Sequence, residues 1–189
     1  MDAQTLTGGF ADPARDAARA FREILEAMAR PGTIRTLAGA APPAGLSPAA
    51  GAALLVLADR TTPVHLAPGH DGPAIRDWLA FHTGAPVVAA GQARFALGGW
   101  AALGPLDRYA PGVAAYPDRS ATLIVEMDAL RPEGARLTGP GIETEARLSL
   151  PEVAAFRANA ARFPLGLDFL FTAGRRLAAL PRTTKVEAG

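Results

Sequence analysis

The segment 163–184 constrains the fold of this chain more than any other, because it holds the densest run of aromatic and branched apolar residues. It reads F-P-L-G-L-D-F-L-F-T-A-G-R-R-L-A-A-L-P-R-T-T. Its first half alternates with a period of two, with Phe169 and Phe171 on the same side, which is typical of a strand. Gly174 allows a tight turn, and Pro181 ends the return strand because proline has no N–H to donate. The segment therefore predicts a β-hairpin in the core.

Two registers are open for this hairpin. A two-residue loop would place Arg176 opposite Phe171. A three-residue loop would place Leu177 opposite Phe171 and Ala179 opposite Phe169. We expect the second register, since it keeps one face apolar and a slip of one residue sends every side chain to the other face.

Composition is ordinary for a globular protein, with 49% hydrophobic and 20% charged residues among 189. We expect a single α/β domain over 1–189, with a loose N-terminal arm at 1–11 and a C-terminal tail at 182–189. The net charge of +1 gives no electrostatic reason to expect nucleic acid or an anionic membrane as a partner. The N-terminus lacks the apolar region of a secretory signal, and every apolar run is too short to span a bilayer. We therefore expect a cytoplasmic protein without membrane contact.

Several kinds of chemistry are excluded by the sequence. Cysteine is absent, which rules out disulfides, thiolate nucleophiles and cysteine-ligated zinc or iron–sulfur sites. There is no P-loop motif, no G-x-S-x-G and no H-E-x-x-H. The glycines of L-T-G-P-G-I at 137–142 precede no helix start, which favours a tight turn over a dinucleotide site. His65 and His70, near Asp71, form either a weak metal or acid–base cluster or a surface strand residue and a turn residue.

Helix starts are the clearest local signals. Asp12 and Ser47 each precede a proline, and an Asp or Ser cap followed by proline is typical of a helix N-terminus. Ser149 and Glu152 have the spacing of a capping box. These signals and the apolar periodicity predict helices at 13–30, 49–58, 73–83 and 152–162.

Strand signals alternate with these helices in the first half of the chain and dominate the second half. The pattern predicts a layered α/β/α domain with a mixed sheet. The first helix is expected to bury an apolar stripe made of Ala17, Phe21, Ile24 and Met28, with Ala20 and Leu25 widening it. Strands are expected at 33–37, 62–67, 86–89, 93–97, 122–127, 135–138, 143–147 and in the hairpin.

Asp168 interrupts an apolar strand, and a carboxylate buried there needs a partner. Arg175, Arg176 and Arg182 are candidates, as are backbone N–H groups of the preceding F-P-L-G bend. Asp168 is then either half of a structural ion pair, a solvent-facing strand residue, or an acid with a perturbed pKa that takes part in function.

The residues after the hairpin combine a guanidinium with two hydroxyls, which suits phosphate or phosphonate oxygens. The alternatives for this segment are a solvated tail and a docking segment for a partner chain. His82 lies near a helix end, where either the helix dipole stabilises it or it binds an oxyanion. The candidate substrate-binding residues are thus His82, Asp168, Arg182, Thr183 and Thr184.

Six short blocks, in order along nearly the whole chain, carry a resemblance to a known family. They are A-M-A-R-P-G (27–32), L-A-D-R-T-T-P-V (57–64), F-H-T-G-A-P (81–86), L-T-G-P-G-I (137–142), F-P-L-G-L-D-F-L-F-T (163–172) and A-L-P-R-T-T (179–184). Together they resemble the PhnH family. Its members are subunits of the bacterial carbon–phosphorus lyase system for phosphonate degradation.

The resemblance implies a fold similar to that of pyridoxal-phosphate-dependent transferases, without the cofactor. It implies a homodimer inside a larger assembly with PhnG, PhnI, PhnJ and PhnL subunits. That assembly forms ribose 1-phosphonate 5-triphosphate from ATP and a phosphonate, with release of adenine. The alternative is an architectural subunit that positions a catalytic partner and makes no substrate contacts of its own.

Neither a cofactor nor activity of the isolated chain is expected. A pyridoxal enzyme needs a Schiff-base lysine in a shaped pocket, and the one lysine here, Lys185, lies near the C-terminus. Self-association is expected to use apolar residues of the irregular segment 98–120, namely Trp100, Leu103 and Tyr109.

Overall fold

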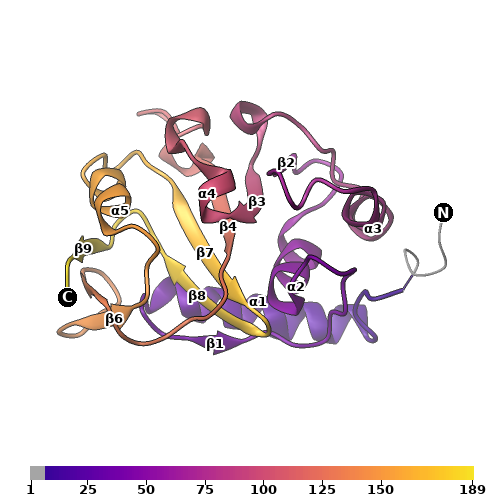
Figure 1. Ribbon diagram of the computed structural model, residues 1–189, viewed down its shortest axis with the longest axis horizontal. Coiled ribbons are helices and arrows are strands. Elements are labelled where there is room, and N and C mark those ends of the chain that lie inside the picture. The colour runs from indigo at the N-terminus through magenta and orange to yellow at the C-terminus, as the bar shows by residue number, and fades with distance from the viewer. Residues whose placement is uncertain (1–6) are drawn as a thin grey trace.

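The computed structural model describes residues 7–189 and shows a mixed α/β architecture (Figure 1). The helices are α1 (Pro13–Ala29), α2 (Pro48–Leu57), α3 (Pro73–Thr83), α4 (Trp100–Leu103) and α5 (Val153–Ala160), with 3-10 turns η2 (Ala90–Gln92), η3 (Leu106–Arg108) and η4 (Pro117–Arg119). The strands are β1 (Arg35–Thr36), β2 (Val64–Leu66), β3 (Phe95–Gly99), β4 (Thr122–Glu126), β5 (Ala135–Thr138), β6 (Ala146–Leu148), β7 (Asp168–Ala173), β8 (Arg176–Leu180) and β9 (Lys185–Glu187).

The main sheet has the order β1-β8-β7-β4-β3-β2. Strands β2, β3, β4 and β7 are parallel, whereas β8 runs antiparallel to β7 and β1 antiparallel to β8. A smaller antiparallel sheet has the order β6-β5-β9. The expected α/β class with a mixed sheet is therefore confirmed.

Two apolar clusters cover the two faces of the main sheet. Residues of α1, α2 and α3 pack with one set of sheet side chains, including Leu170 and Leu177. Residues of α4, α5 and the smaller sheet pack with the other set, including Phe169 and Phe171. Figure 1 shows α1 running beside β8 and β1 along the lower edge, while α5 lies near β6 and β9 at the left. The core is thus layered, with β7 buried on both faces.

The hairpin of β7 and β8 forms as predicted, but the expected register is wrong. A two-residue loop joins the strands, but it places Arg176 opposite Ala173, so neither of the two registers considered from the sequence is observed. Phe171 pairs with Ala178 and Phe169 pairs with Leu180. The expected partners of both phenylalanines lie one residue earlier in β8. Because adjacent side chains of β7 enter different apolar clusters, both faces are buried and a difference in polarity between them cannot select the register.

Two of the predicted helix caps are confirmed. The carboxylate of Asp12 accepts a hydrogen bond from the backbone N–H of Arg15 at 3.2 Å. The hydroxyl of Ser47 accepts one from the N–H of Ala50 at 3.1 Å. Both satisfy donors that a helix N-terminus leaves free.

The buried face of α1 is rotated from the predicted stripe. Ala20 and Ile24 are buried as predicted, and Ala27 is buried as well, whereas Phe21 and Leu25, which were expected on the buried face, are exposed. Small alanine side chains let α1 approach α2 and β8 closely, which a prediction weighted by side-chain size overlooks. The helix therefore presents two large apolar side chains outward.

Two further local predictions are wrong. The Ser149 hydroxyl accepts a hydrogen bond from the backbone N–H of Arg131 instead of capping a helix, and α5 starts without a side-chain cap. Residues 86–89 form no strand and contribute only an isolated bridge between Val87 and Val64. In both places a contact with a distant segment, and not the local sequence pattern, determines the structure.

The N-terminal arm predicted at 1–11 lies partly outside the described residues, which begin at Thr7. The described part is packed against the fold. The N–H of Ala41 donates to the Gly8 carbonyl at 2.9 Å, and Phe10 packs against the cluster under α1 and α2.

Within the segment expected to be a tail, β9 pairs with β5. Val186 is buried between exposed Lys185 and Glu187, which is the alternation of a half-buried strand. Three residues are too few for this pattern to be recognised in the sequence.

The segment 98–120 is more deeply packed than expected. Leu103 and Tyr109 are buried in the core, and burial raises the pKa of the Tyr109 phenol. These two side chains are therefore not available for a dimer contact, although Trp100 is partly exposed.

Candidate functional site

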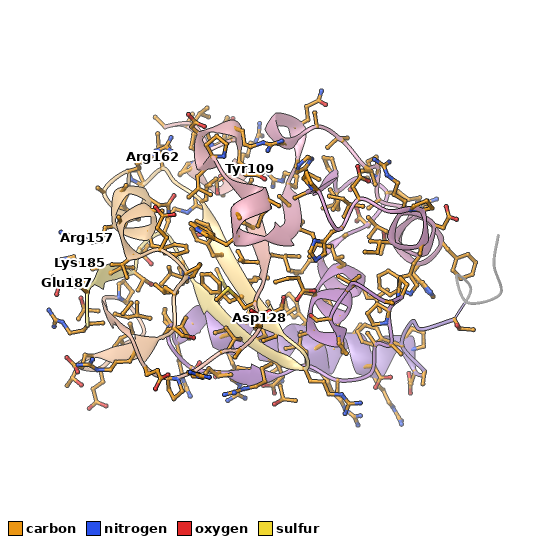
Figure 2. All side chains as sticks on the ribbon, in the orientation of Figure 1. Tyr109, Asp128, Arg157, Arg162, Lys185 and Glu187 are labelled. Atoms are coloured by element: carbon orange, nitrogen blue, oxygen red, sulfur yellow. The ribbon has the colours of Figure 1, made fainter. Side chains whose placement is uncertain are left out.

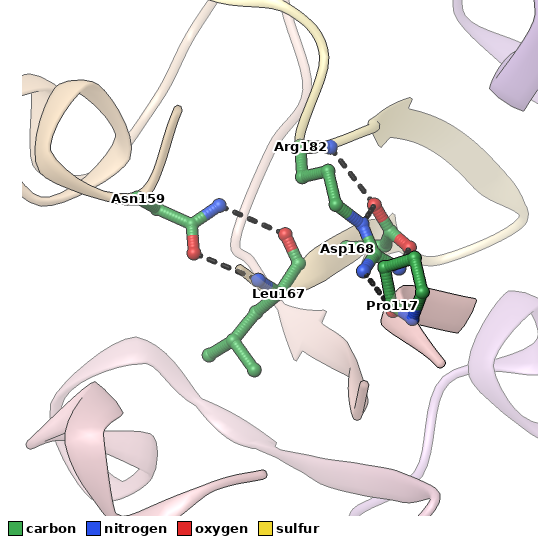
Figure 3. A network of polar contacts seen from close by, with 5 residues as sticks. All are labelled: Pro117, Asn159, Leu167, Asp168 and Arg182. Atoms are coloured by element: carbon green, nitrogen blue, oxygen red, sulfur yellow. Dashed lines mark hydrogen bonds and ion pairs between the residues drawn. The ribbon is translucent and has the colours of Figure 1, made fainter. Parts of the chain in front are cut away.

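The centre of the candidate site is an ion pair between Asp168 and Arg182 (Figure 3). Both carboxylate oxygens are engaged, since Oδ1 accepts the backbone N–H of Arg182 at 2.8 Å and Nε at 3.1 Å while Oδ2 pairs with Nη2. The Nη1 group of Arg182 donates to the carbonyl of Pro117. The side chains of Asp168 and Arg182 are only 14% and 12% exposed. The guanidinium is thus fixed by two separate segments of the chain.

Chain topology explains why these two residues meet. Asp168 opens β7, and the antiparallel pairing of Phe169 with Leu180 brings the start of β7 beside the end of β8. Pro181 ends β8, and Arg182 then turns back toward the carboxylate. Of the three arginines considered as partners for Asp168, the structure selects the one beyond the hairpin.

A second polar clamp holds the bend before β7. The buried side chain of Asn159 accepts the backbone N–H of Leu167 and donates to its carbonyl, both at 2.8 Å (Figure 3). Gly166 has φ of +122°, and a Cβ there would lie 3.1 Å from the Asn159 side-chain oxygen. The bend therefore needs glycine and ties β7 to α5.

A cavity of about 360 Å³ lies beside the ion pair, and we call it the Arg182 cavity. Its walls are largely apolar, with Met28 from α1 facing the same space as Phe163. Its lining residues are Met28, Pro117, Asp118, Phe163, Pro164, Asp168, Pro181, Arg182 and Thr183.

The two threonines after Arg182 differ in environment. Thr183 lines the Arg182 cavity. Thr184 is 1% exposed, and within residues 7–189 its hydroxyl has no hydrogen-bond partner. Of the two, only Thr183 is in a position to meet a ligand in that cavity.

Four of the six sequence blocks meet at this end of the molecule. Met28 of block 27–32 shares the cavity with residues of the last two blocks. In L-T-G-P-G-I, a Cβ on Gly141 would lie 1.9 Å from the Ala29 carbonyl oxygen, and one on Gly139 would lie 3.2 Å from that of Thr183. These glycines allow backbone contacts that hold the blocks together.

His82 lies elsewhere. It lies in the last turn of α3, its Nε2 is 3.2 Å from the Thr7 carbonyl oxygen, and its ring packs against Trp78. It lines a separate cavity of about 390 Å³ beside Pro13, at the first turn of α1, whereas Met28 lies in the last turn. At 1.5 Å per residue, the two ends of α1 are roughly 20 Å apart. The five predicted site residues therefore belong to two places.

The remaining two blocks meet at the start of β2. The N–H of Val64 donates to the Pro86 carbonyl at 2.9 Å. In the turn before β2, Asp59 accepts hydrogen bonds from the side chains of Thr61 and Thr62 and from the backbone N–H of Thr61, each at 2.8 Å. These hydrogen bonds, chiefly that from the Thr61 hydroxyl, hold the pKa of Asp59 below its ordinary value.

The histidine cluster considered as a metal site does not assemble. In the part of the chain that the structure describes, no three His, Asp or Glu side chains gather to hold a metal ion. His65 places Nδ1 3.0 Å from the Val88 carbonyl, and Asp71 pairs with Arg76, whose hydrogen bond lowers the Asp71 pKa. Over the same residues, no helix combines the length and the apolar character needed to cross a bilayer.

Sequence reasoning missed a third cavity, of about 430 Å³, between α4 and the α5 region. Trp100, Glu152 and Arg162 line it, and the indole N–H of Trp100 donates to Glu152 at 3.1 Å. We call it the Trp100 cavity. These residues come from two distant segments of the chain and form no motif, so only the fold reveals them.

Comparison with known proteins gives two matches. The model of the family described as bacterial phosphonate metabolism protein (PhnH) matches residues 8–187, a span that includes all six blocks. The alpha-D-ribose 1-methylphosphonate 5-triphosphate synthase subunit PhnH of Rhizobium meliloti (strain 1021) is 44% identical over 195 residues. That alignment covers 97% of this chain and 96% of the relative.

Proposed function

This chain belongs to the PhnH family of bacterial phosphonate metabolism proteins, and we propose that it is a subunit of an assembly that makes ribose 1-phosphonate 5-triphosphate. In the proposed reaction a phosphonate oxygen bonds to C1′ of the ATP ribose, the bond from C1′ to adenine breaks, and adenine leaves. The observation that carries the proposal is the 44% identity, over nearly the whole chain, to a protein named as a subunit of such a synthase.

We propose PhnG, PhnI, PhnJ and PhnL-like chains as its partners. An apolar surface near the Arg182 cavity supports contact with another protein. Phe163 is 60% exposed and shares that cavity with Pro117, next to which Tyr116 is also exposed. Exposed clusters of large apolar side chains are typical of interaction sites.

Two roles within the assembly remain proposals. In the first, Arg182 and Thr183 bind substrate oxyanions in the Arg182 cavity. Arginine has five N–H donors, of which three are engaged by Asp168 and Pro117, so donors remain for a phosphonate or triphosphate oxygen. Asp168 would then position Arg182, while Thr184 and His82, which do not line this cavity, would contribute only through other contacts.

In the second role the chain is architectural. The support for it is that the Arg182 guanidinium is already paired and that the cavity walls are largely apolar. The same cavity would then receive an apolar side chain of a partner.

Three further properties belong to the proposal. A homodimer inside the assembly is supported by the family membership, and analytical ultracentrifugation tests it. A cytoplasmic location is supported by the use of ATP as substrate. A fold related to pyridoxal-phosphate transferases is supported by the mixed sheet with its parallel strands β2, β3, β4 and β7.

Reconstitution tests the function. The purified chain is mixed with the four partner subunits, ATP and methylphosphonate, and adenine is measured by chromatography. Adenine release is expected only with the complete mixture. Undiminished release without this chain, or release by this chain alone, would contradict the proposal.

Thr183→Val separates the two roles, because it removes a hydroxyl with little change in shape. A variant that still assembles with the partners but releases adenine more slowly supports substrate contact. Unchanged assembly and unchanged release favour the architectural role.

A further inference from the structure

The Trp100 cavity has the properties of a ligand site. Its volume of about 430 Å³ lies in the range of small-molecule sites, about 300–1,000 Å³. It shares no lining residue with the Arg182 cavity. Glu152 and Arg162 bring opposite charges to it from either end of α5, and Trp100 brings an aromatic ring from the start of α4.

The aromatic wall is held in one orientation. Trp100 directly follows β3, and its ring packs against the buried ring of Phe156 with 4.8 Å between centroids. Its indole N–H donates to Oε2 of Glu152 at 3.1 Å. The neighbouring lining residues Gly104 and Ala158 are small and leave room beside the ring. A fixed aromatic ring beside small residues is suited to stacking of a flat ligand.

Both charged groups keep capacity for a ligand. Only one oxygen of Glu152 has a partner among residues 7–189, so the other is free to accept an N–H. The guanidinium of Arg162 makes no hydrogen bond or ion pair with any residue in that range, and its side chain is exposed. Figure 2 shows Arg162 at the periphery of the molecule beside α5. An arginine without a protein partner at the rim of a cavity is suited to an anion.

We propose that the Trp100 cavity binds a nucleoside phosphate. The base stacks on Trp100, its amino group donates to Glu152, and a phosphate pairs with Arg162. A phosphate alone would leave the aromatic wall unused, and an uncharged heterocycle would leave Arg162 unused. This inference deepens the proposed function and rests on it for the choice of an adenine nucleotide, since the proposed reaction consumes ATP.

Calorimetry with the full chain tests this site, using ATP, adenine and inorganic triphosphate as separate probes. ATP is expected to bind saturably. Arg162→Ala should weaken ATP binding by about tenfold, because a charge-assisted hydrogen bond is lost, and leave adenine binding unchanged. Arg157→Ala is the matched control, since Arg157 is an exposed arginine of α5 that does not line the cavity. This variant should bind ATP and adenine as tightly as the wild type.

The aromatic wall is tested by Trp100→Leu, which should weaken ATP and adenine alike by about tenfold, the size of one lost base-stacking contact. Because Trp100 packs on the core, Ala158→Leu provides a second variant. Ala158 is an exposed residue of α5, and a larger side chain there fills the cavity without touching the core. It should weaken ATP and adenine binding while leaving the melting temperature unchanged.

Three outcomes overturn the inference: no saturable ATP binding at millimolar concentration, ATP binding that survives both Ala158→Leu and Arg162→Ala, or triphosphate binding as tightly as ATP. The proposed function is measured separately as adenine release by the complete mixture. If that mixture is active while the isolated chain binds no nucleotide, the inference fails and the proposed function stands. If the chain binds ATP but the mixture releases adenine equally well without it, the proposed function fails alone.

Discussion

Asp168, the first residue of β7, is bonded to Arg182, two residues past the end of β8, through the backbone and the side chain at once. The pair closes the open end of the hairpin, opposite its two-residue loop. The added bond from Arg182 to the Pro117 carbonyl ties this end to the segment before β4. One guanidinium therefore joins three parts of the chain.

Replacing Asp168 should lower the free energy of unfolding substantially. In Asp168→Ala, the largely buried Arg182 charge loses its counter-ion, and a buried pair broken on one side costs about 3–5 kcal/mol of unfolding free energy. Urea unfolding measures this. Asp71→Ala breaks an exposed ion pair with Arg76 and should change stability far less. Equal losses in the two variants would mean that the Asp168 pair is solvated.

Phe169 is central to the core. It is fully buried and packs edge-to-face on Phe156 with 4.9 Å between ring centroids. Phe169→Ala should lower the free energy of unfolding by about 3–5 kcal/mol, the usual cost of truncating a buried Phe. Phe163→Ala is the control, since this ring is 60% exposed and should contribute little to stability. A loss below about 1 kcal/mol for Phe169→Ala would contradict the packing described above.

Close contact between L-T-G-P-G-I and the end of α1 predicts a steric effect at Gly141. Gly141 and Gly69 have similar positive φ values, +81° and +91°, but only Gly141 has a backbone oxygen 1.9 Å from the site of a Cβ. Gly141→Ala should therefore cost about 1–3 kcal/mol more than Gly69→Ala, because both share the backbone strain and only one adds overpacking. Thermal unfolding of the two variants gives the comparison. Similar melting temperatures would contradict it.

The turn at Asp59 predicts a pH dependence of stability. Hydrogen bonds from Thr61 and Thr62 lower the pKa of the Asp59 carboxyl in the folded protein. These bonds therefore stabilise the folded state fully above the unfolded pKa of about 3.9, and this stabilisation is lost as the pH falls through the folded pKa. The stability difference between the wild type and Asp59→Asn should accordingly shrink below about pH 4. NMR titration should show the Asp59 pKa rising in Thr61→Val. A pKa that does not move would mean that the hydroxyl is not the donor.

Lys185 is not placed as a Schiff-base lysine. Its side chain is exposed on β9, whereas an internal aldimine needs a lysine inside a shaped pocket. Pyridoxal phosphate added to the purified chain should give no internal-aldimine absorbance beyond that of an exposed amine. A stable absorbance band that Lys185→Ala abolishes would overturn this expectation.

Local signals in the sequence predict much of the fold. Proline with a side-chain cap marks the starts of α1 and α2, and β3, β4, β5, β7 and β8 lie within or near their predicted ranges. Predictions from the sequence fail where tertiary contacts determine the register of a strand, the buried face of a helix or the partner of a side chain. The hairpin register depends on two buried faces, α1 buries Ala27 instead of Phe21, and the Ser149 hydroxyl accepts a hydrogen bond from Arg131. Short-range patterns contain none of this information.

The site was only partly predictable. Pairing of Asp168 with an arginine follows from the cost of burying a carboxylate, and the sequence offers Arg182 as one of three candidate partners. The separation of His82 from Arg182 depends on the direction of α1, which no motif records. Trp100 and Glu152 are brought together by the fold alone.

Pairing of β1 with β8 affects how the chain folds during synthesis. Arg35 emerges from the ribosome long before its partner Leu177, which follows it by 142 residues. Until β7 and β8 emerge, β4 keeps one unpaired edge and the apolar residues of α1 and α2 have no β8 to cover. Such late, non-local closure is slow and leaves apolar surface exposed to aggregation. A nascent chain stalled before β7 should therefore depend on chaperones, and early contact with another subunit would have to wait for the C-terminal strands.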